Sequence, residues 1–341
     1  MARISGVIGL GGVMKGMVRF TDTFCREAPA LLERIGADAV LVDQLEPGGA
    51  LVAEHLGLPF ASLAVALPIN REPGVPPPFV GWPYDPTPRG SRRNAAGWRV
   101  SDFLMRAVAE SIARNAYRLG LPGRRRLDDC LSSRLQISQL VPALDFPRKS
   151  LPDTFHYTGP FRREGPAAFA PPNPDGRPLV YCSLGTLQGS RSALFRKVAE
   201  ACVGLDLALL LTTGGVDPAP WGPLPGNPSV HLWLPQRAVL PHCDLVICHG
   251  GLNTVLDSVA QGLPMVVMPL AFEQSGIAAR FERAGVASLL SARSSSRRIA
   301  AALDAMRRSP GARGAAAAIR SDMAAAGGVR RAADLIEAEL A

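Results

Sequence analysis

The sequence has no long apolar run, no paired cysteines and very little lysine. Its apolar stretches stop well short of the ~18 uninterrupted residues that a membrane-spanning helix needs. The N-terminus lacks both the apolar segment and the small-residue cleavage site of a secretory signal. Six cysteines are scattered without a CxxC pair, so we expect them to be reduced. These absences predict a cytoplasmic protein without a transmembrane segment.

The charge of the chain argues against a second class of function, nucleic-acid binding. The formal net charge of +8 comes almost entirely from arginine, since Lys15, Lys149 and Lys197 are the only lysines. No arginine cluster is interleaved with aromatic residues, so we expect no nucleic-acid partner. A general codon preference explains the arginines; attraction to phosphate-bearing substrates or to the inner membrane surface is the alternative. With 341 residues and 47% hydrophobic residues, the chain predicts a globular protein of two domains.

The first half of the chain predicts part of an α/β domain, over residues 1–160. Helical and strand patterns alternate, but no strand precedes the first helix, so a doubly wound domain would be incomplete. A proline-dense segment in this half predicts a long ordered loop. The predicted helices cover residues 21–35, 48–56 and 98–119, the strands 39–42 and 60–67, and the loop 68–88.

The second half predicts a complete Rossmann-like domain over residues 179–341, after a proline-rich linker at 161–178. Short apolar runs alternate with helical patterns, which is typical of a parallel sheet with right-handed crossovers. Helices rich in alanine and arginine fill the remainder to the C-terminus. A ligand site is expected where the carboxyl ends of the strands meet. The strands are expected at residues 179–183, 206–212, 230–233, 245–248, 265–268 and 286–289.

A strand that ends in His249-Gly250-Gly251 and leads directly into a helix carries the strongest signal. Glycine lets the backbone approach a ligand closely, and the first amides of a helix attract anions. This junction therefore predicts a pocket for a diphosphate. A tight turn with a structural histidine is the alternative for these three residues alone.

Further polar residues fall at neighbouring strand ends. Asp257 could accept hydrogen bonds from ribose hydroxyls, and Trp233 could stack on a base with Gln236 near the sugar of the nucleoside. Glu273 and Gln274 could bind the vicinal hydroxyls of a second sugar. Together these groups suit a nucleoside diphosphate that carries a sugar.

The segment from Trp233 to Gln274 resembles the signature of inverting, nucleotide-sugar-dependent glycosyltransferases with the GT-B fold. It matches W-x-P-Q, L-x-H, H-x-G-x-N-[ST], G-x-P and [DE]-Q, with Asp257 where that family usually has glutamate. The resemblance implies two Rossmann-like domains facing a cleft, transfer of a hexose from a UDP-sugar, and no metal or cofactor. The donor-binding residues it implies are Trp233, Gln236, His249, Gly251, Asn253, Thr254, Asp257, Glu273 and Gln274, with Ser183 and Thr186 as secondary candidates for phosphate contact.

Phrases in the first half, among them VDQLEPGGALVAEHLGLPF, are similar to the carotenoid branch of that family, the zeaxanthin glucosyltransferases. This resemblance covers nearly the whole chain. It implies that glucose is transferred to a hydroxyl of a lipophilic acceptor, with a carotenoid such as zeaxanthin as the example. Asp43 matches the aspartate that orients the catalytic histidine; a role only as the N-cap of the following helix is the alternative.

The family's catalytic histidine has no match here, because no histidine precedes His55. At 1.5 Å per helical residue, His55 would lie about 12 to 15 Å from Asp43, too far to replace that base. We therefore expect that the family's N-terminal segment is absent. A truncated homologue that binds UDP or a UDP-sugar without catalysis remains the alternative, and an epimerase is a third. Zinc binding by the His242-Cys243 or Cys248-His249 pairs is disfavoured, because neighbours on a strand point to opposite faces.

Overall fold

The computed structural model describes residues 7–162, 169, 171, 176–186 and 189–340, and the chain divides into two compact units. Unit 1 contains the described residues up to Val80, then Tyr84–Arg162 and the chain from Ala324 onward. Unit 2 contains Gly81–Pro83 and the described residues that follow Arg162, up to Met323. Most of the expected linker, residues 161–178, lies outside the described residues.

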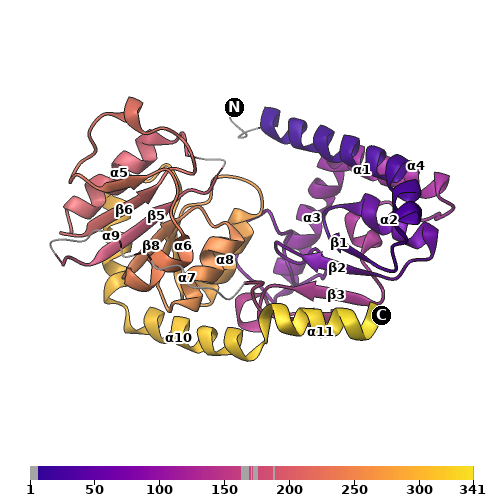
Figure 1. The fold of residues 1–341 in the computed structure, drawn as a ribbon. Coiled ribbons are helices and arrows are strands. Elements are labelled where there is room, and N and C mark those ends of the chain that lie inside the picture. The colour runs from indigo at the N-terminus through magenta and orange to yellow at the C-terminus, as the bar shows by residue number, and fades with distance from the viewer. Residues whose placement is uncertain (1–6, 163–168, 170, 172–175, 187–188, 341) are drawn as a thin grey trace. The chain divides into compact units, whose positions relative to one another are not determined.

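Unit 1 is built on a parallel sheet with the strand order β1-β2-β3-β4 (Figure 1). In the register, Val40 pairs with Phe60 and Ala61 with Leu135. The two strands expected in this half are confirmed, although the second ends earlier than its apolar run. The strands are β1 (Val40–Asp43), β2 (Phe60–Ala64), β3 (Leu135–Ser138) and β4 (Phe155–Tyr157).

Helices cover both faces of this sheet. Neighbouring residues of a strand point to opposite faces, so Phe60 packs in one core cluster and Ala61 in another. The first cluster is completed by α1 (Val7–Ile35), α2 (Pro47–Leu56) and α4 (Arg106–Arg118). In the second, Leu335 and Leu340 of α11 (Gly328–Leu340) pack with strand residues. The expected C-terminal domain, residues 179–341, therefore differs from unit 2 at its C-terminal end.

The proline-dense segment is irregular from residue 65 to residue 87, as expected, and it leads into a helix that begins earlier than predicted. α3 (Pro88–Leu104) begins after Thr87, whose side chain accepts a hydrogen bond from the Gly90 backbone. Proline suits the first helical position because no partner is needed for its nitrogen there. The chain turns at Met105 before α4, so the single helix expected over residues 98–119 is wrong.

Unit 2 contains a parallel sheet with the order β10-β9-β8-β5-β6-β7. From β5 the chain first builds outward on one side, through β6 and β7, and then on the other, through β8, β9 and β10. The order therefore reverses between β5 and β8, which is the position where doubly wound sheets bind ligands. The strands are β5 (Leu179–Ser183), β6 (Ala208–Thr212), β7 (Ser229–His231), β8 (Leu245–Cys248), β9 (Met265–Val267) and β10 (Ala287–Leu289).

The core of unit 2 lies between this sheet and its helices, with Phe195 and Leu303 fully buried in it. The expected alternation of strand and helix is confirmed in this unit.

None of the described helices is long and apolar enough to cross a membrane. The remaining helices are α5 (Ser192–Val203), α6 (Gln236–Val239), α7 (Leu252–Ala260), α8 (Gln274–Arg283), α9 (Ser296–Arg308) and α10 (Pro310–Ala325), and the 3₁₀ turns are η1 (Leu127–Cys130), η2 (Pro142–Leu144), η3 (Ala219–Trp221) and η4 (Leu240–His242).

Candidate functional site

His249 directly follows β8, at the point where the strand order of unit 2 reverses. Two glycines make room for its ring: a Cβ atom on Gly185 would lie 2.8 Å from His249 Nε2, and one on Gly251 would lie 2.6 Å from the same atom. Gly185 also has a φ of +74°, which disfavours other residues. The loops after β5 and β8 are thus shaped around one imidazole ring.

The His249 side chain is half-buried, and its Nδ1 atom, which is buried, has no hydrogen-bond partner in the part of the chain that the structure describes. Burial lowers the pKa of His249, and the Ser183 backbone partly opposes this shift. The imidazole is therefore neutral near pH 7. A buried ring nitrogen without a partner is costly, and a polar ligand would remove that cost.

The N-terminus of α7 lies beside this histidine. Gly251 is its N-cap and supplies no side chain to the first amides of the helix. Unpaired amides and the helix dipole both favour an anion at this end. The predicted diphosphate pocket therefore combines His249 with the start of α7.

The loop after β6 forms a third side of the site, which the sequence reasoning missed. Gly214 and Gly215 both have positive φ angles, of 66° and 90°. A Cβ atom on Gly214 would collide with the Gly185 carbonyl, and one on Gly215 would lie 2.9 Å from Cζ2 of Trp233. Two consecutive glycines directly after an apolar strand were the signal that could have identified this loop.

Trp233 lies two residues beyond β7, with its ring against Gly215. Its side chain is 61% exposed although it is large and aromatic. A rigid, exposed ring beside a glycine loop provides a flat surface for stacking. The structure thus places Trp233 at a strand end, as the sequence predicted.

Three of the predicted donor residues form one hydrogen-bonded network. Gln236 Nε2 donates to Asp257 Oδ2 over 2.7 Å, and Thr254 Oγ1 donates to Gln236 Oε1 over 3.1 Å. Thr254 and Asp257 are buried, whereas Asn253 is exposed at the start of the same helix. The shorter aspartate side chain is therefore held by Gln236, which fixes its orientation at the first turns of α7.

The loop after β9 presents the last predicted pair. Phe272 has a φ of +54°, which is unusual for an aromatic residue and precedes Glu273 directly. Burial raises the pKa of Glu273. Gln274 Oε1 accepts hydrogen bonds from the backbone of Leu270 at 2.8 Å and Ala271 at 2.9 Å, so its carbonyl group stabilises the loop.

The two secondary candidates lie in the loop after β5. Ser183 Oγ accepts a hydrogen bond from the Gly185 backbone over 3.4 Å. Thr186 is exposed, one residue before the undescribed positions 187 and 188. Ser183 and Thr186 therefore both lie within two residues of Gly185, the glycine that makes room for the His249 ring.

Asp43 ends β1 in unit 1. Its Oδ1 accepts a hydrogen bond from the Leu45 backbone over 2.9 Å. The N-cap of α2 is Glu46, whose side chain accepts from Gly48, so the alternative in which Asp43 caps this helix is wrong. His55 lies in the last turn of α2, and its Nδ1 is 2.9 Å from the Leu119 carbonyl oxygen. Asp43 therefore lies before the start of α2 and His55 lies near its end, so the helix separates the two residues, as expected.

Glu46 is the titratable group most perturbed at this end of β1. Burial, with a smaller contribution from the nearby Asp43 carboxylate, raises its pKa to about 7, although the hydrogen bond from Gly48 acts in the opposite direction. A carboxyl group with this pKa exchanges its proton near neutral pH. Its charged form is therefore disfavoured in the folded protein.

Replacing Glu46 with Gln is expected to stabilise unit 1 above pH 7. The folded pKa lies above the unfolded one, so wild-type stability falls as pH rises from about 4.5 to about 7 and then levels off. After allowance for solvent screening at this half-buried site, the loss in free energy of unfolding is about 1–2 kcal/mol. Urea unfolding at a series of pH values measures this free energy for both proteins. A Glu46→Gln variant whose free energy of unfolding falls with pH as steeply as that of wild type would contradict the prediction.

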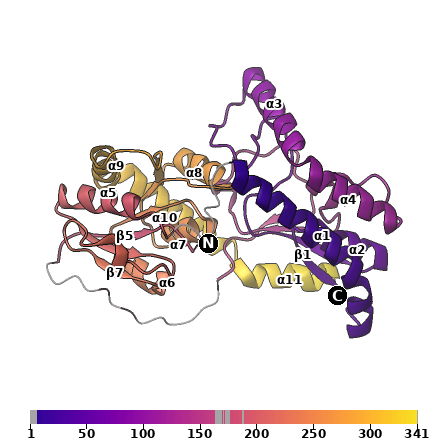
Figure 2. The same ribbon diagram turned by 90° about the horizontal axis from the view of Figure 1, so that it is seen from above.

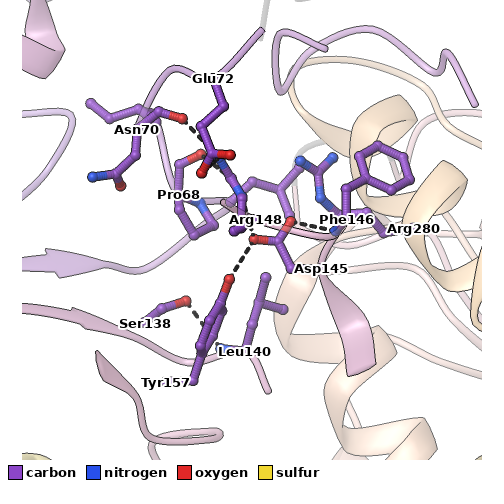
Figure 3. Close-up of polar contacts among 12 residues, drawn as sticks. Pro68, Asn70, Glu72, Ser138, Leu140, Asp145, Phe146, Arg148, Tyr157 and Arg280 are labelled. Atoms are coloured by element: carbon purple, nitrogen blue, oxygen red, sulfur yellow. Dashed lines mark hydrogen bonds and ion pairs between the residues drawn. The ribbon is translucent and has the colours of Figure 1, made fainter. Parts of the chain in front are cut away.

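The start of the proline-dense loop is fixed by a buried ion-pair cluster (Figure 3). Arg148 Nε lies 2.9 Å from Asp145 Oδ2, and its Nη1 lies 3.9 Å from Glu72 Oε1. Arg148 also donates to the carbonyls of Asn70, at 2.8 Å, and Pro68, at 3.4 Å. The guanidinium group thus holds the first residues of the loop beside the segment that precedes β4.

The cysteine–histidine pairs do not form a metal centre among the described residues, where no group of three or more metal-ligating side chains occurs. Burial raises the pKa of Cys248 to about 12, and burial with Asp244 nearby raises that of Cys243 to about 12. Thiolate is the form that binds metal, so both thiols are poor ligands. Metal-free chemistry remains a prediction.

Comparisons with known proteins show which family the chain is similar to. The family described as "UDP-glucoronosyl and UDP-glucosyl transferase" matches residues 131–313. Zeaxanthin glucosyltransferase of Pseudescherichia vulneris is 42% identical over 96% of this chain and 80% of its own length. That of Pantoea ananas is 40% identical, over 94% of this chain and 76% of its own length.

The same likeness extends to solved structures. The calicheamicin glycosyltransferase CalG4 superposes with a TM-score of 0.78 at 25% identity, covering 96% of this chain and 82% of that protein. The expected fold, with two Rossmann-like sheets of the GT-B type, is confirmed by this match and by the two parallel sheets.

Proposed function

Because the chain belongs to the family of UDP-glucuronosyl and UDP-glucosyl transferases, we propose that it transfers glucose from UDP-glucose to a hydroxyl group of a carotenoid such as zeaxanthin, with inversion at the anomeric carbon. The observation that carries this proposal is the 42% identity to a zeaxanthin glucosyltransferase over 96% of the chain. The donor would bind in unit 2, and unit 1 would contribute to acceptor binding.

The donor site is assigned from the strand ends of unit 2. The uracil base stacks on Trp233, and the ribose hydroxyls bind the Gln236–Asp257 pair. The diphosphate lies at the start of α7, where His249 donates a hydrogen bond and Ser183 and Thr186 border the pocket. Glu273 and Gln274 face the hexose hydroxyls. Each assigned group lies at the end of a strand of unit 2 or in the loop or helix that follows one, as described above.

The chemistry requires charge stabilisation on the leaving group. The acceptor oxygen attacks the anomeric carbon from the face opposite to UDP and releases its proton to a base or to water, while the bond from that carbon to the phosphate oxygen breaks. Negative charge then collects on UDP. Preorganised donors in a water-poor site stabilise such charge strongly, and His249 with the first amides of α7 would provide them.

A UDP-binding protein without transferase activity is the second candidate. It is favoured by the position of His55, which is hydrogen-bonded at the far end of α2 from Asp43. In this case UDP would bind in the donor site of unit 2, but no residue matching the family's histidine would remove the proton of the acceptor hydroxyl.

Trp233→Ala is expected to weaken UDP binding by about 1–3 kcal/mol, the range measured for stacking of a base on an aromatic side chain. Calorimetry with UDP measures this loss. Trp221→Ala is the matched control, because that ring stacks on Phe195, with 5.1 Å between centroids, outside the proposed donor site. Equal affinity in Trp233→Ala and wild type would remove Trp233 from the donor site.

Product analysis distinguishes the two candidate functions. The full chain is incubated with UDP-glucose and zeaxanthin, and the carotenoid fraction is separated by chromatography. A β-linked glucoside supports inverting transfer. UDP binding without any glucoside supports the second candidate, and failure to bind UDP contradicts both.

A further inference from the structure

We propose that the outer face of α3 is a docking surface for an anionic lipid bilayer. Three large apolar side chains near the C-terminal end of this helix are exposed: Val100 is 58% exposed, Phe103 70% and Leu104 47%. Single exposed apolar residues are ordinary on protein surfaces. These three are spaced at i, i+3 and i+4 along one helix, so their side chains are neighbours and form a patch.

Arginines lie on the same exposed face. Arg92 and Arg99 of α3 lie seven residues apart, a spacing that returns to nearly the same side of a helix. Arg106 is the first residue of α4, and its guanidinium group lies 5.9 Å from the centre of the Phe103 ring. Within the described part of the chain, Arg92 and Arg99 form no ion pair, and Arg106 lies 3.6 Å from Glu110, both side chains being exposed. The face thus combines cationic and apolar groups, and we call it the α3 face.

This combination fits a membrane surface better than other partners. Cationic side chains are attracted to anionic headgroups, while apolar side chains insert at the boundary with the acyl chains. A nucleic acid would use the arginines but leave Phe103 and Leu104 in water. The charge complementarity therefore favours anionic lipid.

The opposite side of α3 is occupied by the proline-dense loop. Asn94 Nδ2 donates to the Pro73 carbonyl over 3.1 Å, and the Arg71 guanidinium lies 4.3 Å from the centre of the Trp98 ring. Arg71 also pairs with Asp102 at 2.7 Å. The loop therefore holds the inner side of α3, while α3 extends away from the sheet of unit 1 (Figure 2).

The sequence offered attraction to the inner membrane surface as one explanation of the arginines, and the helix expected over residues 98–119 contained Arg99, Arg106, Arg114 and Arg118. The structure confines the proposed surface to α3 and the first residue of α4. Arg114 is paired with Asp22 at 2.9 Å, and α4 packs in the core of unit 1 through Val108 and Ile112. Arg114 and Arg118 are therefore not part of the α3 face.

The role of such a surface rests on the proposed function. A carotenoid is dissolved in the bilayer, so a transferase that uses it must work at the membrane. Docking through α3 would bring the attached loop to the lipid that holds the acceptor. UDP binding takes place in unit 2 and does not depend on this surface.

Vesicle flotation of the full chain tests the proposal. We expect binding to vesicles of mixed phosphatidylglycerol and phosphatidylcholine, little binding to phosphatidylcholine alone, and release by salt. The triple variant Arg92→Gln, Arg99→Gln, Arg106→Gln should partition about 100-fold less, since each arginine contributes about 1 kcal/mol near an anionic surface. Phe103→Ser with Leu104→Ser should also reduce partitioning.

The control variant Arg298→Gln, Arg313→Gln, Arg320→Gln removes the same net charge from exposed positions in unit 2. It should bind the anionic vesicles like wild type. Equal losses in both triple variants, or no flotation of wild type, overturn the proposal. A dimer in light scattering that Phe103→Ser dissociates would assign the face to a second copy instead. UDP calorimetry on the same samples shows separately whether the donor site is intact.

Discussion

Replacing Arg148 with Met is expected to destabilise unit 1 by about 3–5 kcal/mol, the usual cost of removing one partner from a buried ion pair. The side chains of Asp145 and Glu72 are 1% and 4% exposed, so both would keep a buried charge or take up a proton. Asp145 would retain the hydroxyl of Tyr157 at 2.8 Å and the Phe146 backbone at 2.8 Å, while Glu72 would retain the Lys149 backbone at 2.8 Å. These bonds cannot replace the guanidinium charge.

Hydrogen-exchange mass spectrometry measures this effect on peptides from β3 and β4, and it reports unit 1 separately from unit 2. Exchange in those peptides should become faster, and exchange in β5 and β8 should not change. Arg118→Met is the control, because Arg118 is an exposed residue at the end of α4. A change below about 0.5 kcal/mol, the usual range for surface substitutions, would mean that the cluster does not anchor the loop.

Turnover of UDP-glucose and zeaxanthin by this chain is expected to be about 10²- to 10⁴-fold slower than by the Pseudescherichia vulneris relative, which is the usual contribution of a general base. The family resemblance assigns that base to a histidine oriented by the aspartate at Asp43, and no histidine precedes His55 in this sequence. Asp43 here accepts a hydrogen bond from Leu45. Initial rates of both proteins at matched donor saturation provide the comparison.

Comparable turnover of the two proteins would contradict this expectation and require another base. Glu46 would then be tested first, because its pKa of about 7 suits proton transfer near neutral pH. Loss of such activity in Glu46→Gln, with unchanged UDP affinity, would assign the base to Glu46.

The donor side of the molecule was largely predictable because its signals are local. A strand followed by His249-Gly250-Gly251 and a helix needs no tertiary information, and the structure places this junction where the strand order reverses. The Gly214-Gly215 loop was missed because its role depends on contact with Gly185 and Trp233, which are distant in sequence. Glycine alone does not reveal what it approaches.

Other differences come from interactions that periodicity does not encode. Apolar residues of α11 follow a helical pattern whichever sheet they cover, so the sequence could not assign this helix to unit 1. The break at Met105 was hidden because apolar spacing continues from α3 into α4. Gln236 and Asp257 were both expected to face a ligand, but their mutual hydrogen bond is a tertiary contact.

Calorimetric titration of the chain with UDP tests the central claim most directly, namely that the strand ends of unit 2 around His249 form a nucleotide-sugar site. We predict one UDP per chain, and binding weaker by about 1.5–3 kcal/mol in His249→Ala, because a hydrogen bond to a charged group is lost. His242→Ala should bind like wild type, since His242 is exposed in η4. A folded wild-type protein that binds no UDP, or His249→Ala with unchanged affinity, would contradict the account.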